Sequence, residues 1–391
     1  DSGAAKSMVN FFIKLFHGKN LELSTGMAAY IMSIPVFGDV TMVLISPLCA
    51  IISKRQNKPM GQMAAFTVLA LNLTHSMVPP TPGILAVAVL LGADLGLVIL
   101  WGIVCSFIAY IITWILMRKW AGKDYYPPKP EFVEGVEEVK SNDYHDLLIK
   151  EENLPNVLFA MSPILVPVIL IALASFADMT MAEGAMARVV LDTLGNRNIA
   201  MFLGMVFGWL LAVTHKEKAL ANYNQTSGKN EKSLFTMMFN GWVGEALEVA
   251  LVPLIVTGFG GGFAQIIKDA PAAGELGDVV AASGFPGLLV PFVIGAVMEC
   301  AVGSRTTAGM TAAGLCLPML DSLGISAVAC AVMIGAGTMI VSHVNDSGWW
   351  VSQSMLNMDM TRTFKYNTLV GGVAGVIAGI VGAIFITVGA M

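Results

Sequence analysis

The sequence predicts an all-α polytopic membrane protein with inverted-topology repeats and discontinuous helices. Three observations support this fold class: the composition, a correspondence between the two halves of the chain, and helix-breaking residues inside apolar runs. Of the 391 residues, 56% are hydrophobic and only 13% are charged, whereas soluble domains carry about 25% charged residues. A soluble protein with buried helices would need more polar surface than this chain has, so a bilayer is the expected environment.

Several apolar runs have the length of a transmembrane helix. Val157–Phe176 and Leu369–Met391 both lack any charged residue. Because an α-helix rises about 1.5 Å per residue, each run can cross a hydrocarbon layer about 30 Å thick. The apolar run 84–117 is long enough for a short helical piece followed by a complete span.

One long hydrophilic segment divides the apolar sequence. Residues 118–153 contain nine acidic and six basic residues and, near their start, the stretch YYPPKP, which is typical of a linker outside the membrane. The expected organisation follows from this linker. Residues 1–117 form a first repeat, 118–153 the linker, 154–232 linking or scaffold helices, and 233–391 a second repeat.

The two repeats correspond at a constant offset along the chain. Thr74-His75 aligns with Ser342-His343, although the identities are few and chance similarity is the alternative. At the same offset, the basic loop at Lys54-Arg55 aligns with an uncharged loop, and the basic residues Arg362 and Lys365 align with a loop that has none. Because basic short loops stay on the cytoplasmic side, this exchange predicts repeats of opposite orientation, the plan of many secondary transporters.

Four clusters of helix-breaking residues interrupt the apolar runs. They are Ile34–Asp39, His75–Gly83, Gly258–Gln265 and Gly303–Gly309. Transmembrane backbone tolerates such breaks only where protein or water satisfies its hydrogen bonds. The prolines of the second cluster preclude one continuous helix. In the third cluster, the consecutive glycines Gly260, Gly261 and Gly262 permit a hairpin tip with exposed amide groups.

The fourth break is a candidate anion site. The N-terminus of a half-helix offers unpaired N–H groups, and Ser304, Arg305 and Thr306 add hydroxyl and guanidinium donors. An arginine at membrane depth indicates a functional role. The alternative is a structural ion pair between Arg305 and the nearby Glu299.

A fifth polar stretch, Ser342–Trp350 (SHVNDSGWW), follows an apolar run directly. Its Asn345, Asp346 and Ser347 are candidates to bind substrate hydroxyl groups. His343, Asp346 or Asp39 is expected to take up a coupling ion, because carboxyl and imidazole groups change charge when their environment is desolvated. The alternatives are a structural role for His343 and helix N-cap roles for the two aspartates.

Other function classes lack support in the sequence. The five cysteines lie singly in apolar segments and are interpreted as small buried hydrophobic residues. The sequence has no basic patch that could neutralise nucleic-acid phosphates, so no nucleic-acid partner is expected. No cofactor or metal is expected either. An intramembrane enzyme would need a nucleophile–base pair or metal ligands, and no HExxH or GxSxG occurs. A channel is a further alternative, which saturable substrate exchange would exclude.

The chain resembles the gluconate permease family of bacterial proton symporters, within the ion transporter superfamily. The resemblance rests on DSGAA, IPVFGDV, HSMVPPTPG, GFGGGFAQIIKD, GSRTTAG and SHVNDSGWW, which occur in the family's order and cover essentially the whole chain. It implies a multi-pass carrier of the bacterial inner membrane for gluconate or related hydroxy acids, with re-entrant hairpins and a homodimeric assembly. It also implies that further helices precede residue 1.

Some residues depart from the family pattern. Thr81 stands where the family usually has a histidine, and Ile84 where it has a proline. The family usually carries an arginine at Glu299 and a small residue at Arg305, so the positive charge is displaced toward the tip of the break. Gluconate as the particular substrate is therefore open, with glycerate, 3-hydroxybutyrate and D-serine as alternatives.

The expected function is secondary active import of a small hydroxy-carboxylate coupled to protons, or to sodium ions as the alternative. The expected coupling residues are Asp39, His343 and Asp346. The expected substrate-binding residues are Thr81, Gly260, Gly261, Gly262, Gln265, Ser304, Arg305, Thr306, Asn345, Asp346 and Ser347.

Overall fold

The structure, a computed structural model, describes residues 2–34, 38–134, 136, 144–149, 153–182, 184–248, 251 and 284–391. Every regular element within these ranges is helical. The contacts divide the chain into two units, residues 1–19 with 141–255 and residues 20–140 with 256–391. The four sequence segments expected above cut the chain differently, and they stay predictions.

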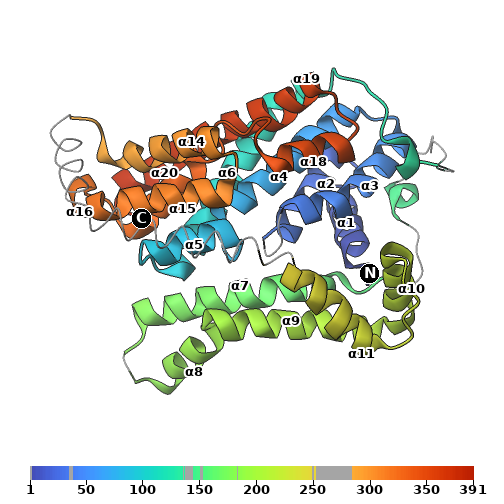
Figure 1. The fold of residues 1–391 in the computed structure, drawn as a ribbon, viewed down its shortest axis with the longest axis horizontal. Coiled ribbons are helices and arrows are strands. Elements are labelled where there is room, and N and C mark those ends of the chain that lie inside the picture. Colours follow the sequence, from blue (N-terminus) through green and yellow to red (C-terminus); the bar gives the residue numbers. More distant parts are fainter. Residues whose placement is uncertain are drawn as a thin grey trace. The chain divides into compact units, whose positions relative to one another are not determined.

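The first unit is built around α7 (Val157–Thr180), which packs against α1 (Ala4–Leu15), α8 (Met186–Gly195) and α9 (Arg197–Thr214). In Figure 1, α7 and α9 run side by side in green to yellow-green. The side chain of Asn156 caps α7 by accepting a hydrogen bond from the Leu158 amide. Shorter elements of this unit are η2 (Tyr144–Leu147), α10 (Lys216–Ser227), α11 (Leu234–Thr236) and η3 (Met237–Trp242).

The second unit contains two sets of helices. The first set is α2 (Leu21–Met32), α3 (Gly38–Gln56), α4 (Met60–Met77), α5 (Pro82–Leu90) and α6 (Leu95–Ala121). The second set is α14 (Val290–Val302), α15 (Arg305–Cys316), α17 (Ala327–Gly337), α18 (Ser347–Met355) and a last span made of α19 (Met360–Thr363), η6 (Phe364–Leu369) and α20 (Val370–Thr387). The short elements η1 (Pro130–Phe132), η4 (Gly287–Leu289), η5 (Leu317–Met319) and α16 (Leu320–Leu323) lie between or beside them.

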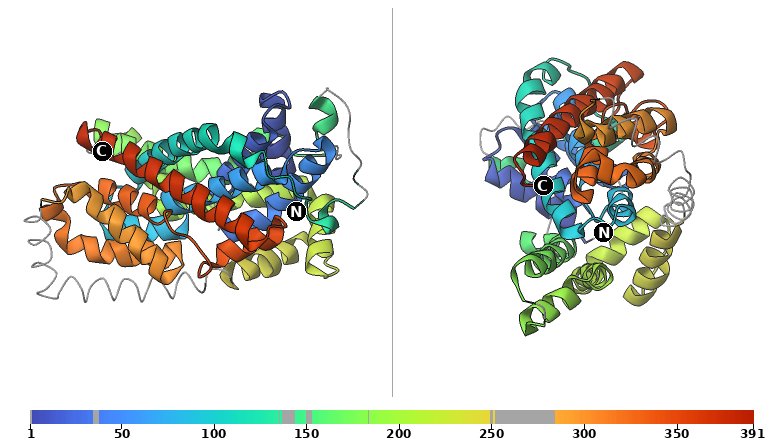
Figure 2. Two further views of the ribbon diagram at one scale, coloured as in Figure 1. Left: turned by 90° about the horizontal axis from the view of Figure 1, so that it is seen from above. Right: turned by 90° about the vertical axis from the view of Figure 1, so that its left-hand side faces the viewer.

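The two sets correspond helix by helix. The starts of the paired helices are separated by nearly the same distance along the chain as Thr74 and Ser342, the offset that the sequence motifs predict. The packing corresponds too, because α2 contacts α4 as α14 contacts α17, and α3 contacts α18 as α15 contacts α5. Figure 1 and the two views of Figure 2 show α20 (red) running beside α6 (teal), the final span of each set. The opposite orientation of the two repeats stays a prediction.

Several helices are long and apolar enough to cross a membrane. Within the described ranges these are Met60–Leu90, Leu95–Ala121, Val157–Asp178 and Met360–Thr387, and the bent pair Met186–Gly195 with Asn198–Thr214 is a fifth if it forms one span. Leu95–Ala121 and Met360–Thr387 contain 27 and 28 residues, more than the ~20 that a bilayer requires. The longest apolar runs of the sequence therefore lie in helices that have the length and composition of membrane spans.

Three of the predicted breaks lie at helix ends. α4 ends at Met77 and α5 begins at Pro82, with a cis Pro79–Pro80 bond between them. α14 ends at Val302, where Gly303 has a left-handed φ of 69°, and α15 begins at Arg305. α17 ends at Gly337 and α18 begins at Ser347. α3 begins at Gly38, whereas residues 35–37 of the first break and the glycine cluster 258–265 lie outside the described residues.

Glycines allow the helices of the second unit to approach closely. A Cβ atom added at Gly102 of α6 would lie 2.0 Å from the Met77 carbonyl oxygen, and one at Gly337 would lie 2.1 Å from the Phe292 carbonyl oxygen. Both neighbours are backbone atoms, which cannot rotate away. Small residues of this kind are how membrane helices obtain close van der Waals packing.

We predict that Gly102→Ala destabilises the protein by about 1–3 kcal/mol, the usual cost of overpacking a core. The better helix propensity of alanine, worth up to about 1 kcal/mol, offsets only part of this effect. Thermal unfolding in detergent measures it. Gly208→Ala in α9 is the matched control, because no described residue outside its own helix lies within 4 Å of a Cβ there. An equal response of both variants would contradict the packing argument.

An ion-pair cluster fixes the segment after α6 to the start of the last span. Asp124 accepts hydrogen bonds from Arg362 Nε at 3.1 Å and from the Tyr366 hydroxyl at 2.8 Å. The Arg362 guanidinium also lies 4.6 Å from the centroid of the Tyr126 ring. Burial raises the pKa of Asp124, but the donors and the positive charge of Arg362 outweigh burial and lower the pKa below its ordinary value.

Asp124→Asn is therefore expected to lower the unfolding temperature at neutral pH. A carboxyl whose pKa is depressed by folding contributes stability above its unfolded pKa of about 3.9, and this contribution disappears as the pH falls through the folded pKa. The difference between wild type and variant should accordingly shrink below about pH 4. Glu217→Gln on α10, where the glutamate is exposed, is the control, and a difference that does not change with pH would count against this assignment.

Candidate functional site

Asp346 is the centre of the break between α17 and α18. Its Oδ1 accepts a hydrogen bond from the Gly348 amide at 2.8 Å, which makes it the N-cap of α18. Its Oδ2 accepts a hydrogen bond from the Ser342 hydroxyl at 2.6 Å. The N-cap role that the sequence left as an alternative is thus confirmed, and it fixes the orientation of the carboxylate.

Arg305, the first residue of α15, forms an ion pair with this carboxylate. Its Nη1 lies 3.1 Å from Asp346 Oδ2, and the two side chains are only 8% and 7% exposed. The alternative pairing of Arg305 with Glu299 is wrong for the described residues, because neither carboxyl oxygen of Glu299 has a hydrogen-bond partner there. Arg305 reaches Asp346 instead since the left-handed Gly303 turns the chain between α14 and α15.

Two further residues of the polar stretch bind the end of α14. The Asn345 amide nitrogen donates to the Cys300 carbonyl oxygen at 3.0 Å, and His343 Nε2 lies 3.7 Å from the Cys300 sulfur. Gly303 makes this contact possible, because an added Cβ would lie 2.3 Å from the Asn345 side chain. The breaks at 303 and 338–346 therefore meet in one place. Cys300 is exposed, so the expectation that all five cysteines are buried is wrong for this one.

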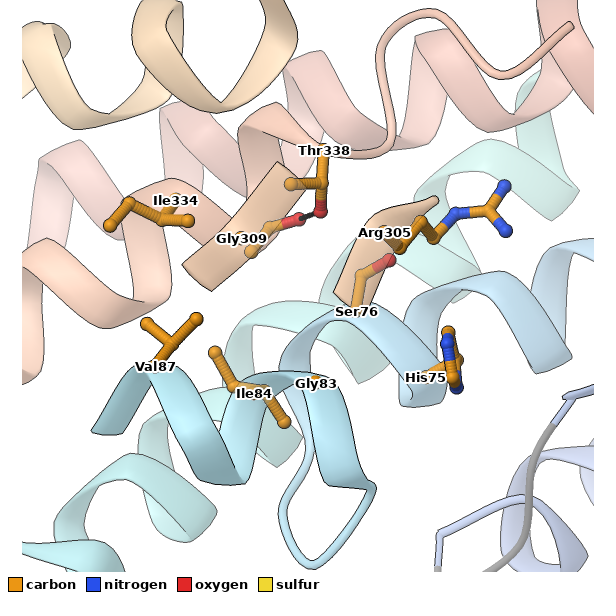
Figure 3. A pocket seen from close by; sticks show the side chains of 10 residues that line it. His75, Ser76, Gly83, Ile84, Val87, Arg305, Gly309, Ile334 and Thr338 are labelled. Atoms are coloured by element: carbon orange, nitrogen blue, oxygen red, sulfur yellow. Dashed lines mark hydrogen bonds between the residues drawn. The ribbon is translucent and has the colours of Figure 1, made fainter. Parts of the chain in front are cut away.

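A small pocket lies beside the ion pair. Its empty volume is about 200 Å³, including space open to solvent, and its lining comes from α4, α5, α15 and the end of α17. Figure 3 shows a polar end, with His75 and the Arg305 side chain, and an apolar end with Val87 and Ile334. The complete lining is His75, Ser76, Gly83, Ile84, Val87, Arg305, Gly309, Ile334, Gly335 and Thr338.

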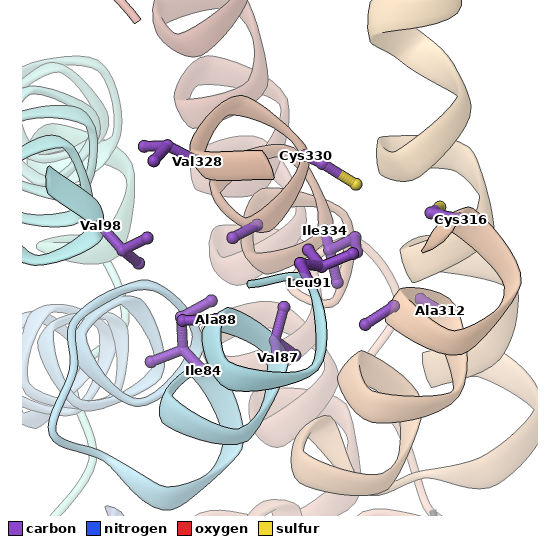
Figure 4. Packing of buried hydrophobic residues seen from close by; sticks show 12 residues of the cluster. Ile84, Val87, Ala88, Leu91, Val98, Ala312, Cys316, Val328, Cys330 and Ile334 are labelled. Atoms are coloured by element: carbon purple, nitrogen blue, oxygen red, sulfur yellow. The ribbon is translucent and has the colours of Figure 1, made fainter. Parts of the chain in front are cut away.

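The apolar end of the pocket belongs to a larger hydrophobic cluster. Ile84, Val87 and Ile334 are each at most 2% exposed and pack with Ala312 and Cys316 of α15. Figure 4 shows these residues converging from α5, α15 and α17. The cluster positions the pocket wall, because side chains in a close-packed core have little freedom to move.

Glycines bring the polar end together. An added Cβ at Gly83 would lie 3.0 Å from the Thr306 hydroxyl, and one at Gly335 would lie 2.5 Å from the Ser76 carbonyl oxygen. The first halves of α5 and α15 can therefore touch at the breaks of the two repeats. Larger residues at these positions would separate the two breaks.

Comparison with known proteins shows the family of this chain. The family model for GntP family permeases matches residues 1–391. The chain belongs to the GntP permease family. It is 27% identical over 387 residues to a gluconate permease of Pseudomonas aeruginosa, covering 99% of this chain and 80% of the relative. It is also 27% identical over 380 residues to a D-serine transporter of Escherichia coli (strain K12), covering 96% and 79%.

A solved structure has a similar fold. It belongs to a Neisseria gonorrhoeae protein described with a class of antimetabolite efflux pumps. The TM-score is 0.59 at 14% sequence identity, and the match covers 99% of this chain and 79% of the other. Membership of a permease family makes the protein a multi-pass membrane transporter rather than an enzyme.

The predicted site residues of this permease fall into three groups. Ser304, Arg305, Thr306 and Asp346 lie together at the meeting of the two breaks. Ser304 caps α15 by accepting from the Thr307 amide, and Thr306 is 9% exposed. Their substrate-binding roles stay predictions.

The second group has side chains that are already engaged or exposed. The Thr81 hydroxyl is buried and donates to the Val78 carbonyl oxygen at 2.8 Å, so it closes the turn before α5. Asn345 and Ser347 are exposed. The third group lies outside the described residues: Gly260, Gly261, Gly262 and Gln265, together with the side chain of Asp39 in the first turn of α3.

Residues that were not among the predicted site residues support the ion pair. Ser342 holds Asp346, and its own carbonyl oxygen accepts from the Thr368 hydroxyl at 2.5 Å in η6. The indole N–H of the buried Trp349 donates to the same hydroxyl at 3.1 Å. The signal available in the sequence was weak, because a serine between α17 and α18 and a threonine in η6 show no spacing that predicts contact.

A second buried chain of polar groups joins α4, η6 and α18. The Asn72 amide donates to Asn367 Oδ1 at 3.0 Å, and the Asn367 amide donates to the Ser352 hydroxyl at 3.0 Å. The wide π-type turns of η6 orient Asn367 for this role, and such turns are frequent near functional sites. Within the described ranges, no three His, Cys, Asp or Glu residues are grouped as they would be to hold a metal ion.

Asp346→Asn is expected to destabilise the permease by about 3–5 kcal/mol, because it leaves the buried charge of Arg305 without its counter-ion. Asparagine is as good an N-cap as aspartate, so the loss reports the charge. Adding Arg305→Met should recover most of the stability, since the double variant buries no unpaired charge. Thermal unfolding of the two single variants and the double variant measures this, and strictly additive losses would refute a direct pair.

Proposed function

We propose that this permease is a secondary active transporter of the bacterial inner membrane that imports a small hydroxylated carboxylate together with a proton. The observation that carries the proposal is Arg305, a guanidinium buried at a helix break with only part of its donor capacity used. The family of this chain consists of permeases. The relatives named above are described as a gluconate permease and a D-serine transporter. A substrate with a carboxylate and a hydroxyl group fits both descriptions.

The donors of Arg305 support an anion site. A guanidinium has five N–H groups in a fixed fork, and Asp346 takes one at Nη1. Nε is buried and has no hydrogen-bond partner among the described residues. A substrate carboxylate would satisfy such donors in the bidentate manner that arginine favours. The N-terminus of α15, whose first residues are Arg305 and Thr306, adds a positive dipole end.

The pocket favours a substrate with few hydroxyl groups within this class. Its apolar end is lined by buried hydrocarbon side chains. Ile84, Val87 and Ile334 offer no hydrogen bond to a hydroxyl group, and a buried hydroxyl without a partner costs about 1–3 kcal/mol. We therefore place 3-hydroxybutyrate, glycerate and D-serine ahead of gluconate, whose five hydroxyl groups would need more partners.

Proton coupling and assembly belong to the same proposal, with sodium coupling as the alternative. Among the coupling candidates from the sequence, Asp346 is held by Arg305, Ser342 and the Gly348 amide, so its charge is already compensated. His343 is half-buried beside Cys300 and stays a coupling candidate. A homodimer is the proposed assembly.

Uptake by proteoliposomes with an imposed pH gradient tests the proposal. Wild type should accumulate labelled 3-hydroxybutyrate, glycerate or D-serine in preference to gluconate, and should show saturable counterflow. Arg305→Lys keeps the charge but loses the bidentate fork, so uptake should fall by about 30-fold or more, the factor that corresponds to about 2 kcal/mol.

Arg188→Lys is the matched control for this experiment. Arg188 forms an ion pair with Asp178 at 2.7 Å in the first unit and should transport like wild type. If accumulation depends on a sodium gradient and not on a pH gradient, the transporter is coupled to sodium ions rather than to protons. Full uptake by Arg305→Lys would remove Arg305 from the substrate site.

A further inference from the structure

Glu299 is a carboxyl group that the proposed substrate site does not use. It is 0% exposed, and neither of its carboxyl oxygens has a hydrogen-bond partner among the described residues. It lies in the last turn of α14, directly before Cys300, whose carbonyl oxygen binds Asn345. The chain therefore places an unpartnered acid at the meeting of the two breaks.

Physical chemistry disfavours the ionised form of this acid in the present arrangement. A buried carboxylate without donors loses its hydration and gains no hydrogen bond in return. The C-terminal end of a helix carries a partial negative charge, which repels an anion. A proton on Glu299 removes both penalties.

The charged neighbours of Glu299 connect it to the substrate site. α14 packs against α15, α17 and η4, and the ionisable side chains that these elements carry are Arg305, Cys316 and Cys330. Of the three, Arg305 bears the charge, and it lies within electrostatic range of Glu299, as does its partner Asp346. Among the described residues, Cys300 and His343 also lie at this end of α14.

We propose that Glu299 carries the coupled proton, by competing with the substrate carboxylate for Arg305. This inference rests on the proposed function. A protonated Glu299 leaves the free N–H groups of Arg305 to the substrate, whereas an ionised Glu299 is attracted to the same guanidinium and displaces the substrate. The proton and the substrate anion then bind together or not at all.

The charges balance through one cycle. A proton from the external water adds to the Glu299 carboxylate and forms an O–H group, and the substrate anion then pairs with Arg305. After the site opens to the other side, the anion dissociates, the O–H bond breaks, and the proton leaves to the internal water. One proton and one monocarboxylate cross without net movement of charge, so a potassium diffusion potential should leave 3-hydroxybutyrate uptake unchanged.

Glu299→Gln tests this role, because glutamine resembles the protonated carboxyl group but cannot release a proton. In proteoliposomes with labelled 3-hydroxybutyrate, glycerate and D-serine, the variant should still exchange substrate across the membrane. It should lose accumulation driven by a pH gradient and reach only equal concentrations on both sides. Glu217→Gln on α10, where the residue is exposed, is the matched control and should accumulate like wild type.

A second measurement is independent of the substrate. The infrared spectrum of the purified protein at neutral pH should contain a C=O stretching band of a protonated carboxyl group that Glu299→Gln removes and Glu217→Gln retains. A band unchanged by Glu299→Gln, or accumulation by that variant equal to wild type, would overturn the role of Glu299 while proton-coupled transport stands. Wild-type transport that ignores the pH gradient would overturn the coupling part of the proposed function, even where the band is lost as expected.

Discussion

The ion pair between Arg305 and Asp346 is the interaction on which the centre of this permease depends. Both side chains are more than nine-tenths buried, where each charge alone would be strongly destabilising. The pair joins the break before α15 to the break before α18, two positions that are distant in the sequence. Asp346 also caps the N-terminus of α18. The same carboxylate therefore fixes where α18 begins and where the buried Arg305 guanidinium lies.

The surrounding structure holds this pair through backbone proximity and buried hydroxyl groups. Gly303 lets Asn345 approach the end of α14, and Gly335 lets α17 approach the carbonyl oxygen of Ser76. Thr368 in η6 binds both the backbone of Ser342 and the indole of Trp349. Interrupted helices leave backbone groups unpaired, and in a membrane these groups need partners from the protein. The breaks are therefore surrounded by small and hydroxylated residues.

The pocket beside Arg305 has a polar end and an apolar end. Polar groups from α4 and α15 face the pocket at one end, and the hydrophobic cluster of α5, α15 and α17 closes the other. In an amphipathic pocket, leaving a buried polar group unpaired costs more than an extra apolar contact gains. Glu299, on the far side of Gly303 from Arg305 along the chain, adds an acid whose charge state would alter what the guanidinium can bind.

The sequence by itself determined the membrane class, the long spans, the offset between the repeats and the positions of the breaks at Pro79-Pro80, Gly303 and Ser342–Asp346. The composition of a segment and the prolines and glycines within it affect that segment alone. Their structural effects can therefore be predicted without knowing which helices are in contact. The sequence also pointed to Arg305 and Asp346, because charges in apolar segments are expensive and few.

Only the tertiary structure decided which of these residues meet. Arg305 pairs with Asp346 rather than with Glu299 because the left-handed turn at Gly303 redirects the chain, although Glu299 is much nearer in sequence. Thr81 uses its hydroxyl in a turn, whereas Ser342 and Thr368, which were not among the predicted site residues, support the site. Contacts between helices depend on packing in three dimensions, and a single sequence does not specify which polar residue will lie opposite another.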